Sequence, residues 1–237
     1  LYQPRVDTLS GKVVSTEALI RWNHPRMGPV GPAEFIPVFE RTALMPAVSG
    51  WVVDAALDQL AAWHRAGLSL SLSINLAASD LSTEGMAERL LQKLTERGLA
   101  PALLEIEITE GEWLRANTVA GDQLTRLAGV GVRVAIDDFG SGYSNFGYLS
   151  QLPISTIKMD KSLIDHLADD PAARLKAKAI IELAQGLGYL TVAEGVENQA
   201  QHDVLRELGC DQLQGYLFAP PLSAEELAIA VGVVGQA

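Results

Sequence analysis

The chain has 237 residues, of which 48% are hydrophobic and 20% are charged, as in an ordinary soluble globular protein. Eighteen basic and 29 acidic residues give a net charge of −11, which argues against a nucleic-acid polymer as partner, because such binding needs a broad basic surface. No segment reaches the apolar length of a membrane span, and the single cysteine, Cys210, allows no internal disulfide.

The length fits one closed barrel of eight strand-helix units, which takes about 250 residues. We therefore expect residues 1–237 to form a single domain. The first residue is Leu rather than Met and no signal peptide is visible, so we interpret the chain as a domain excised from a longer multidomain protein. A lone cysteine suits a reducing compartment. The expected location is the cytoplasm, either as a free protein or as the cytoplasmic part of a membrane-anchored one.

Hydrophobic periodicity predicts two opening strands, Tyr2 to Val6 and Val13 to Arg21, whose short turn favours antiparallel pairing. Helices and strands then alternate. Further strands are predicted at Leu70 to Asn75, Leu104 to Glu107, Val132 to Asp137, Thr156 to Met159, Leu190 to Ala193 and Gln212 to Leu213. Helices are predicted at Pro32 to Arg41, Val48 to Ala66, Asp80 to Arg97, Ala116 to Leu127, Ala172 to Leu187, Gln199 to Leu208 and Ser223 to Val233. Eight strands in this alternation predict an α/β fold, a mostly parallel closed barrel.

Several predicted strands end in a group that can hold a cation or a phosphate. These groups are Asn75, Glu107, Asp137, Asp138, Lys158 and Glu194. A buried carboxylate is costly to desolvate unless a cation lies against it, and the carboxyl ends of barrel strands meet at one mouth. The pattern therefore predicts one shared site. Any single member, such as Asn75, is also compatible with ordinary loop or helix-cap chemistry.

Oxygen ligands without His or Cys favour Mg²⁺ or Mn²⁺ over zinc or copper. The adjacent Asp137 and Asp138 favour an arrangement in which one carboxylate bridges two metals and its neighbour binds one. A turn cap by one of the two is compatible with this arrangement. The Gly-rich segment from Phe139 to Ser144 matches neither a P-loop nor a dinucleotide fingerprint, and its position beside the acids makes it a candidate lid.

The segment Glu17-Ala18-Leu19-Ile20-Arg21-Trp22-Asn23-His24-Pro25 resembles the signature of the EAL domain, the cyclic di-GMP phosphodiesterase family. Other matching motifs follow in order over nearly the whole chain: Tyr2-Gln3-Pro4, Phe35-Ile36-Pro37, Ser73-Ile74-Asn75-Leu76, Glu107-Ile108-Thr109-Glu110, Asp137-Asp138-Phe139-Gly140, Ile157-Lys158-Met159-Asp160, Ala193-Glu194-Gly195-Val196-Glu197 and Gln214-Gly215-Tyr216. The resemblance implies a (β/α)8-like TIM-barrel variant with its first strand antiparallel to the others. It also implies hydrolysis of cyclic di-GMP to linear pGpG.

The resemblance further implies two Mg²⁺ or Mn²⁺ ions per site. The positions that match the ligands of one metal are Glu17, Asn75, Glu107 and Asp137. Those that match the second are Asp137, Asp138 and Glu194, the last directly or through water. Lys158 matches a lysine near the attacking water; an ion pair with Asp160 or Asp138 is the alternative. The catalytic residues expected on this basis are Glu17, Asp138, Lys158 and Glu194.

Around these groups the resemblance implies further roles. Arg21 matches a substrate-contacting arginine, and Gln3 and Gln214 match polar contacts to substrate or water, with ordinary loop hydrogen bonds as the alternative. Glu110 matches a glutamate that anchors the loop from Phe139 to Phe146, which the family links to dimer contacts and activation; a helix cap or surface role is the alternative. Asp160 and Glu197 are expected beside the site as supporting residues.

Cyclic di-GMP, an upstream regulatory or GGDEF-type domain and a second copy of the chain are the partners that the resemblance implies. A catalytically weak or inactive cyclic di-GMP receptor is the alternative function. Receptors in this family have typically lost metal ligands or the signature glutamate, whereas every such position is filled here. The departures from the family pattern are Ser141, Asn145-Phe146 and the segment from Thr42 to Met45, and they concern regulation more than chemistry.

Overall fold

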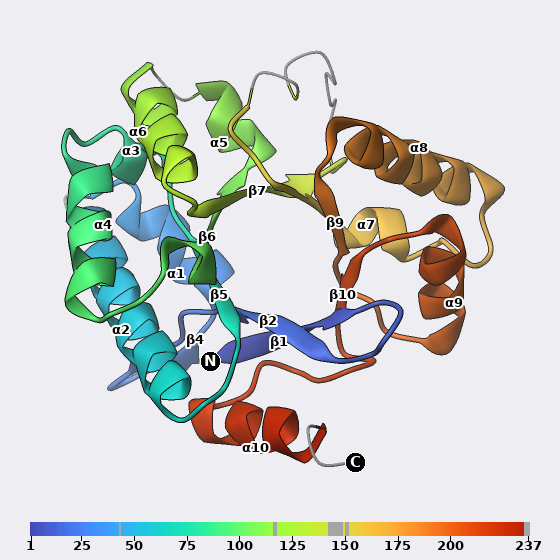
Figure 1. Ribbon diagram of the computed structural model, residues 1–237, viewed down its shortest axis with the longest axis horizontal. Helices are drawn as coiled ribbons and strands as arrows, with labels where there is room; N and C mark the ends of the chain where they lie inside the picture. Colours follow the sequence, from blue (N-terminus) through green and yellow to red (C-terminus); the bar gives the residue numbers. More distant parts are fainter. Residues whose placement is uncertain (43, 116–117, 142–148, 150–151, 235–237) are drawn as a thin grey trace.

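The computed structural model describes residues 1–42, 44–115, 118–141, 149 and 152–234. Eight of the described strands close into a barrel in the order β1-β10-β9-β8-β7-β6-β5-β2, and helices surround it (Figure 1). The strands are β1 (Tyr2–Asp7), β2 (Val13–Ala18), β3 (Trp22–His24), β4 (Gly28–Val30), β5 (Ser71–Asn75), β6 (Leu104–Thr109), β7 (Arg133–Phe139), β8 (Thr156–Met159), β9 (Leu190–Ala193) and β10 (Gln212–Gln214). The helices are α1 (Pro32–Phe39), α2 (Met45–Arg65), α3 (Ala78–Leu81), α4 (Met86–Glu96), the 3-10 helix η1 (Pro101–Leu103), α5 (Glu110–Arg115), α6 (Thr118–Gly129), α7 (Lys161–Ile164), α8 (Pro171–Leu187), α9 (Gln199–Leu208) and α10 (Ala224–Val234).

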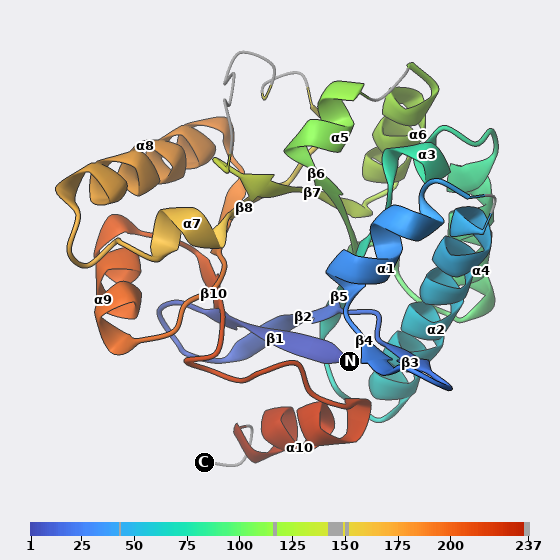
Figure 2. The ribbon, with the colours of Figure 1, turned by 180° about the vertical axis from the view of Figure 1, so that it is seen from behind.

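The first strand runs against the rest of the barrel. β1 pairs antiparallel with both of its neighbours, β2 and β10, whereas the pairs from β2 through β5 to β10 are parallel. The predicted barrel with an antiparallel first strand is therefore confirmed. Figure 2 shows the same closed ring from behind, with β1 and β2 adjacent.

The barrel wall divides apolar from polar side chains by strand alternation. In β6 the buried residues Leu104, Ile106 and Ile108 belong to the hydrophobic core, while Glu105 and Glu107 alternate with them and lie on the opposite face. The apolar face packs against the helices, since Leu57 and Leu60 of α2 belong to the same core. The interior of the barrel is consequently polar, and it is the place where the site forms.

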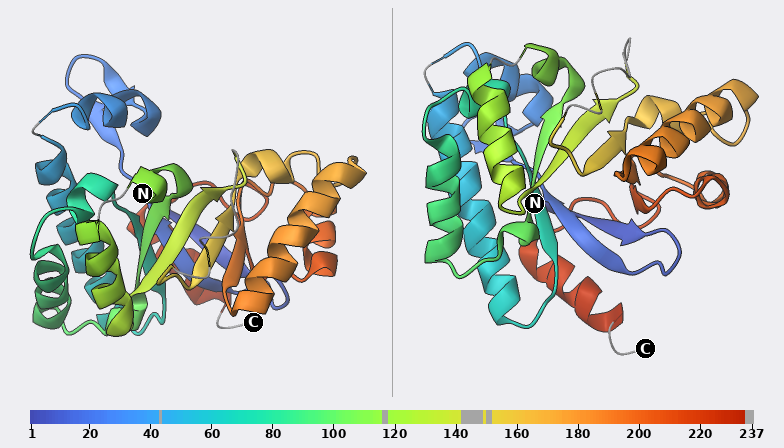
Figure 3. Two further views of the ribbon diagram at one scale, coloured as in Figure 1. Left: turned by 90° about the horizontal axis from the view of Figure 1, so that it is seen from above. Right: turned by 45° about the horizontal axis from the view of Figure 1, so that its top comes forward.

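Two predicted elements have different bounds in the structure. The predicted strand from Val13 to Arg21 ends at Ala18, and a separate hairpin of β3 and β4 follows, which stands out with α1 beyond the barrel in Figure 3. The predicted helix from Asp80 to Arg97 is two helices, α3 and α4. They are separated because Gly85 has a left-handed φ of 72°, which interrupts a helix.

Two short helices, α5 and α7, stand where no helix was predicted, because each is too brief for a periodic pattern. The longer helices lie close to their predicted ranges, and α8 and α9 begin at recognisable caps. The Asp170 carboxylate accepts from the Ala172 N–H at the start of α8, and Asn198 forms a capping box with Gln201 at the start of α9. Among the described helices, none has the length and apolar character to cross a membrane.

Candidate metal centre

Each of the eight barrel strands contributes one polar side chain to the mouth of the barrel. In chain order they are Gln3, Glu17, Asn75, Glu107, Asp137, Lys158, Glu194 and Gln214, of which Glu194 directly follows β9. The sequence predicts all eight for the site, and the structure brings them together in one connected network of hydrogen bonds and ion pairs. Their roles remain predictions, whereas their convergence is a property of the fold.

Lys158 lies at the centre of this network and is completely buried. Its Nζ is 2.7 Å from an oxygen of Glu107, 2.7 Å from Glu194 and 3.0 Å from Asp137. A fourth carboxylate, that of Glu17, lies 3.5 Å away. Burial alone would lower the pKa of Lys158, but these carboxylates outweigh it and hold the pKa well above its usual range. The lysine is thus a permanent cation surrounded by four acids.

Glu17 is held by two amides as well as by this lysine. The Asn75 side-chain amide donates to one Glu17 oxygen at 2.8 Å, and the Gln214 amide donates to the other at 2.8 Å. Burial raises the pKa of Glu17, but the charge of Lys158 and the hydrogen bond from Gln214 outweigh it and bring the pKa to about 2. Glu17 is therefore an ionised carboxylate in a fixed orientation.

Three further acids of the mouth, the buried Glu107, the half-buried Glu194 and the exposed Asp138, are not fully compensated by the lysine. Burial raises the pKa of Glu194 to about 8, against the opposing charge of Lys158. Burial, followed by the charge of Glu17, raises the pKa of Glu107 well above its ordinary value. Burial and the neighbouring Asp137 charge also raise the pKa of Asp138. The mouth thus has more acidic charge than its own cations balance, so additional bound cations would stabilise it.

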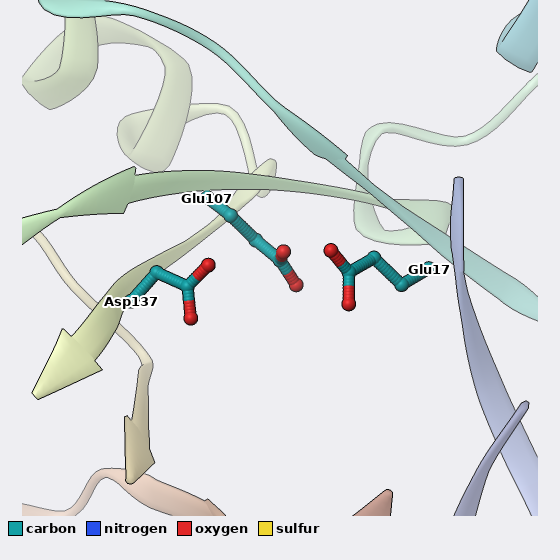
Figure 4. A group of neighbouring side chains, drawn as sticks. All are labelled: Glu17, Glu107 and Asp137. Atoms are coloured by element: carbon teal, nitrogen blue, oxygen red, sulfur yellow. The ribbon is translucent and has the colours of Figure 1, made fainter. Parts of the chain in front are cut away.

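Two groups of three carboxylates could each hold a cation. Glu17, Glu107 and Asp137 offer ligand oxygens that lie within 4.8 Å of one another, and they point toward a common space in Figure 4. The second group is Asp137, Asp138 and Glu194, with its oxygens within the same distance. Asp137 belongs to both. The donors are hard oxygens, which fit Mg²⁺ or Mn²⁺.

Asp138 has an unusual backbone conformation, with φ at 55°, in the left-handed region that a residue with a side chain rarely adopts. Its N–H donates to an Asp137 carboxylate oxygen at 3.0 Å, and its own carbonyl accepts from the Ser141 hydroxyl at 2.8 Å. Left-handed residues cluster at functional sites because the surrounding structure offsets their strain. Here the turn directs two consecutive carboxylates toward one site.

A cavity of about 380 Å³ opens onto this network. Its wall includes Gln3, Glu17, Leu19, Asp137, Lys161, Glu194, Gly195, Glu197, Gln214, Gly215 and Tyr216. Cavities of this size hold small ligands rather than polymers. The expected supporting residue Glu197 lines this cavity and pairs with Lys161. The acidic network therefore has an open approach from the mouth.

The other predicted residues lie farther from the network. Arg21 is exposed, donates to the carbonyl of Ile20 at 2.8 Å and borders two neighbouring hollows. Asp160 caps α7 by accepting from the Ser162 N–H at 3.0 Å, and none of the ion pairs seen for Lys158 in the described part of the chain goes to Asp160 or Asp138.

Glu110 is buried and begins α5, directly after the end of β6. Its expected partner is the loop from Phe139 to Phe146. Residues 142–146 of that loop lie outside the described residues, as does Ala43 in the segment from Thr42 to Met45. The anchoring role of Glu110 accordingly stays a prediction.

A second polar layer lies beneath the mouth, and the sequence analysis missed it. Arg5 of β1 and Glu105 of β6 are 1% and 2% exposed, and their side chains form an ion pair at 2.7 Å. The Thr156 hydroxyl donates to the other Glu105 oxygen at 2.8 Å. Each of the three lies two residues from a mouth residue of its own strand, namely Gln3, Glu107 or Lys158. Because side chains two apart in a strand share a face, strand alternation could have indicated that all three point into the barrel.

A family model described as the EAL domain matches residues 1–221. The chain is 42% identical over 227 residues to the cyclic di-GMP phosphodiesterase PA2567 of Pseudomonas aeruginosa, covering 96% of this chain and 39% of that protein. It is 37% identical over 231 residues to the bifunctional diguanylate cyclase/cyclic di-GMP phosphodiesterase MucR of the same organism, covering 97% and 34%. A solved PaMucR phosphodiesterase complex with c-di-GMP superposes with a TM-score of 0.89 at 37% identity, over 95% of this chain and 92% of that one. The chain thus spans less than two fifths of these curated relatives.

Proposed function

Because the chain belongs to the EAL domain family, we propose that it is a metal-dependent phosphodiesterase that hydrolyses one phosphodiester bond of cyclic di-GMP and releases linear pGpG. Two relatives named as cyclic di-GMP phosphodiesterases match nearly the whole chain. A solved relative of 37% identity binds c-di-GMP. These likenesses support the substrate, and the chemistry of the mouth supports the reaction.

The observation that carries the proposal is the pair of carboxylate groups that share Asp137 around Lys158. Two carboxylate groups that share one residue would suit two cations held close together, as in two-metal hydrolysis of phosphodiesters. The excess of buried acid and the all-oxygen donor set fit Mg²⁺ or Mn²⁺. When bound, the cations supply positive charge that activates water and stabilises the phosphate oxygens.

We assign Glu17, Asn75, Glu107 and Asp137 to one cation, and Asp137, Asp138 and Glu194 to the other. The Gln214 amide donates to Glu17 and also to Gln3 at 3.2 Å. This position beside Glu17 supports a role for both glutamines in contact with substrate or water. Lys158 is a fixed cation in contact with both carboxylate groups, so it can orient the attacking water and stabilise developing negative charge. Arg21, which is exposed beside two neighbouring hollows, offers a planar fork to a phosphate.

The test is incubation of the purified protein with cyclic di-GMP and either Mg²⁺ or Mn²⁺, with pGpG followed by chromatography and a chelator added in a parallel reaction. We expect pGpG to form with either cation and to stop forming with chelator. Glu17→Ala is the matched loss-of-function variant. Tight nucleotide binding with no product under either cation would instead support the receptor function.

We propose that the longer protein joins this domain to a regulatory or GGDEF-type domain, since a bifunctional relative combines the cyclase and phosphodiesterase activities. We also propose a homodimer and a cytoplasmic site of action, where a nucleotide second messenger would be met. Light scattering of the purified chain across a concentration series tests the dimer: a constant monomer mass would contradict it.

A further inference from the structure

The buried ion pair of Arg5 and Glu105 is the feature that the proposed reaction does not use. A buried arginine and carboxylate are costly to desolvate, and a hydrophobic pair would often serve the fold as well. Burial lowers the pKa of Arg5, but the charges of Glu105 and Glu107 outweigh it and raise the pKa. The arginine is therefore charged, and its field reaches beyond its own partner to a residue of the mouth.

Glu107 lies between two basic side chains, Lys158 on one of its oxygens and Arg5 on the other. Its Oε2 accepts from Lys158 Nζ at 2.7 Å. Its Oε1 is buried, makes no hydrogen bond among the described residues, and faces the Arg5 guanidinium at 3.6 Å. Because Arg5 lies beneath the mouth in the layer of Glu105, it attracts Oε1 away from the opening. Oε2 is the oxygen that shares Lys158 with Glu17 and Asp137, the other two members of the carboxylate group.

The number of oxygens that a carboxylate offers matters for the choice of cation. Ca²⁺ takes six to eight oxygens at about 2.3–2.6 Å and readily accepts both oxygens of one carboxylate. Mg²⁺ demands octahedral geometry at about 2.0–2.1 Å, which suits single oxygens from several carboxylates. A glutamate restrained at one oxygen therefore favours the smaller ion.

We propose that Arg5, held in place by Glu105, is a positioning residue that restricts Glu107 to a single ligand oxygen and so makes the mouth select Mg²⁺ or Mn²⁺ over Ca²⁺. Thr156 completes the arrangement, because its hydroxyl fixes the far oxygen of Glu105. The proposal rests on the proposed metal site, but it concerns which ion binds and not whether the nucleotide is cut.

The test is calorimetric titration of the chelator-treated full chain with MgCl₂, MnCl₂ and CaCl₂ in the absence of nucleotide. In Arg5→Met, we expect the affinity for Ca²⁺ relative to Mg²⁺ to rise about tenfold, the lower end of the effect of residues that orient metal ligands. Arg5→Lys keeps the charge at this position and should retain most of the parent selectivity. Arg133→Met is the matched control, because Arg133 acts on Glu105 without an ion pair to Glu107 among the described contacts.

A second variant, Arg5→Met with Glu105→Met, removes the two charges together and keeps the experiment informative if the single variant does not fold. It should also lose selectivity while melting cooperatively. Equal weakening of all three cations, or an unchanged ratio in folded variants, would show that the pair is merely structural. A parent that selects Mg²⁺ yet releases no pGpG would overturn the proposed hydrolysis alone. A parent that binds none of the three cations would overturn both.

Discussion

Asp137 belongs to both carboxylate groups at the mouth, whereas Glu194 belongs to one. Asp137→Ala should therefore abolish binding of both cations and reduce the rate about a hundredfold or more, beyond the loss expected for a residue that only supports a ligand. Glu194→Gln should leave one cation bound. Manganese stoichiometry by calorimetry, together with pGpG formation, measures the difference. Full activity of Asp137→Ala would contradict the two-metal assignment.

The opposite pKa shifts of Glu194 and Glu17 predict how stability depends on pH when metal is removed. The pKa of Glu194 is raised by burial to about 8, so the folded protein holds this proton more tightly than the unfolded one. Its stabilising contribution is complete below the ordinary value of 4.5 and is lost as the pH rises through about 8. Glu17, at about 2, stabilises above 4.5 and loses this contribution as the pH falls toward 2.

Thermal melting of the metal-free protein, measured with chelator at a series of pH values, tests this pH dependence of stability. We expect the melting temperature to fall between about pH 5 and pH 9, because Glu194 and Glu107 must then ionise inside the fold. Glu194→Gln cannot ionise and should flatten this part of the curve. An equally steep fall in that variant would mean that another group dominates.

The strand pattern predicted Asn75, Glu107, Asp137, Lys158 and Glu194, because each stands at or next to the end of a predicted strand. Glu17, Gln3 and Gln214 were predicted only from the resemblance to the EAL domain. Arg5 and Glu105 were not singled out, since each lies in mid-strand and looks like one charge among many in the sequence. Their pairing depends on the closure of β1 against β10, which brings residues 5 and 105 together across the interior. A contact of this kind depends on barrel geometry that a linear pattern does not contain.

At the scale of elements, the loop after β9 is held by a close contact between backbone and side chain. Gly195 has φ at 66°, and a Cβ there would lie 2.5 Å from Cγ and 2.8 Å from Cβ of Lys161. Lys161 also pairs with Glu197 and thus ties the loop to the start of α7. The contact fixes the position of the preceding residue, Glu194.

Gly195→Ala should consequently destabilise the protein by about 2 kcal/mol or more, combining the strain of a left-handed alanine with overpacking. Lys161→Ala alone should cost less, because its ion pairs are exposed. The double variant removes the contact with Cγ and should recover that part of the overpacking, whereas the contact with Cβ of residue 161 and the backbone strain remain. Denaturant unfolding of the three variants gives the coupling; strictly additive effects would show that the two residues do not contact in solution.

Element prediction was most accurate for α8, which has a long periodic pattern, and it missed several short elements. The seventeen-residue helix α8 has a clear amphipathic period and a capping Asp170, and its predicted range is correct to within one residue. The three-residue strands β3 and β4 and the four-residue helix α7 contain too few positions to show a period. Their conformations are set by the neighbouring chain.

At the scale of the whole molecule, strand-helix alternation with an opening hairpin predicted the barrel and its antiparallel strand. Both are local signals repeated along the chain, which explains why the architecture was accessible from the sequence. The charge balance of the barrel interior could not be predicted from the sequence, because it depends on all eight strands at once. Four carboxylates around one lysine leave a surplus of acid that the complete barrel brings into one place.

Metal should therefore stabilise the entire fold. A cation that binds the folded chain and not the unfolded one raises the free energy of unfolding by about 2.7 kcal/mol at a hundred times its Kd. We expect Mg²⁺ or Mn²⁺ to raise the melting temperature and chelator to reverse the change. Asp137→Ala should melt at the same temperature with or without metal. A metal-independent melting temperature of the parent would contradict a cation site in the barrel.

The reversed direction of β1 has a mechanical consequence. The first residues of β1, and not its last, reach the mouth of the barrel. Gln3 lies at the mouth, while Asp7 pairs with Gln212 at the opposite end. The amino group of Leu1 donates to the carbonyl of Leu19, a wall residue of the cavity, at 3.0 Å. A force applied at the amino end would thus act within a few residues on Gln3, Gln214 and Glu17. In a barrel with a parallel first strand, the same force would arrive on the far face, a full strand length from the chemistry.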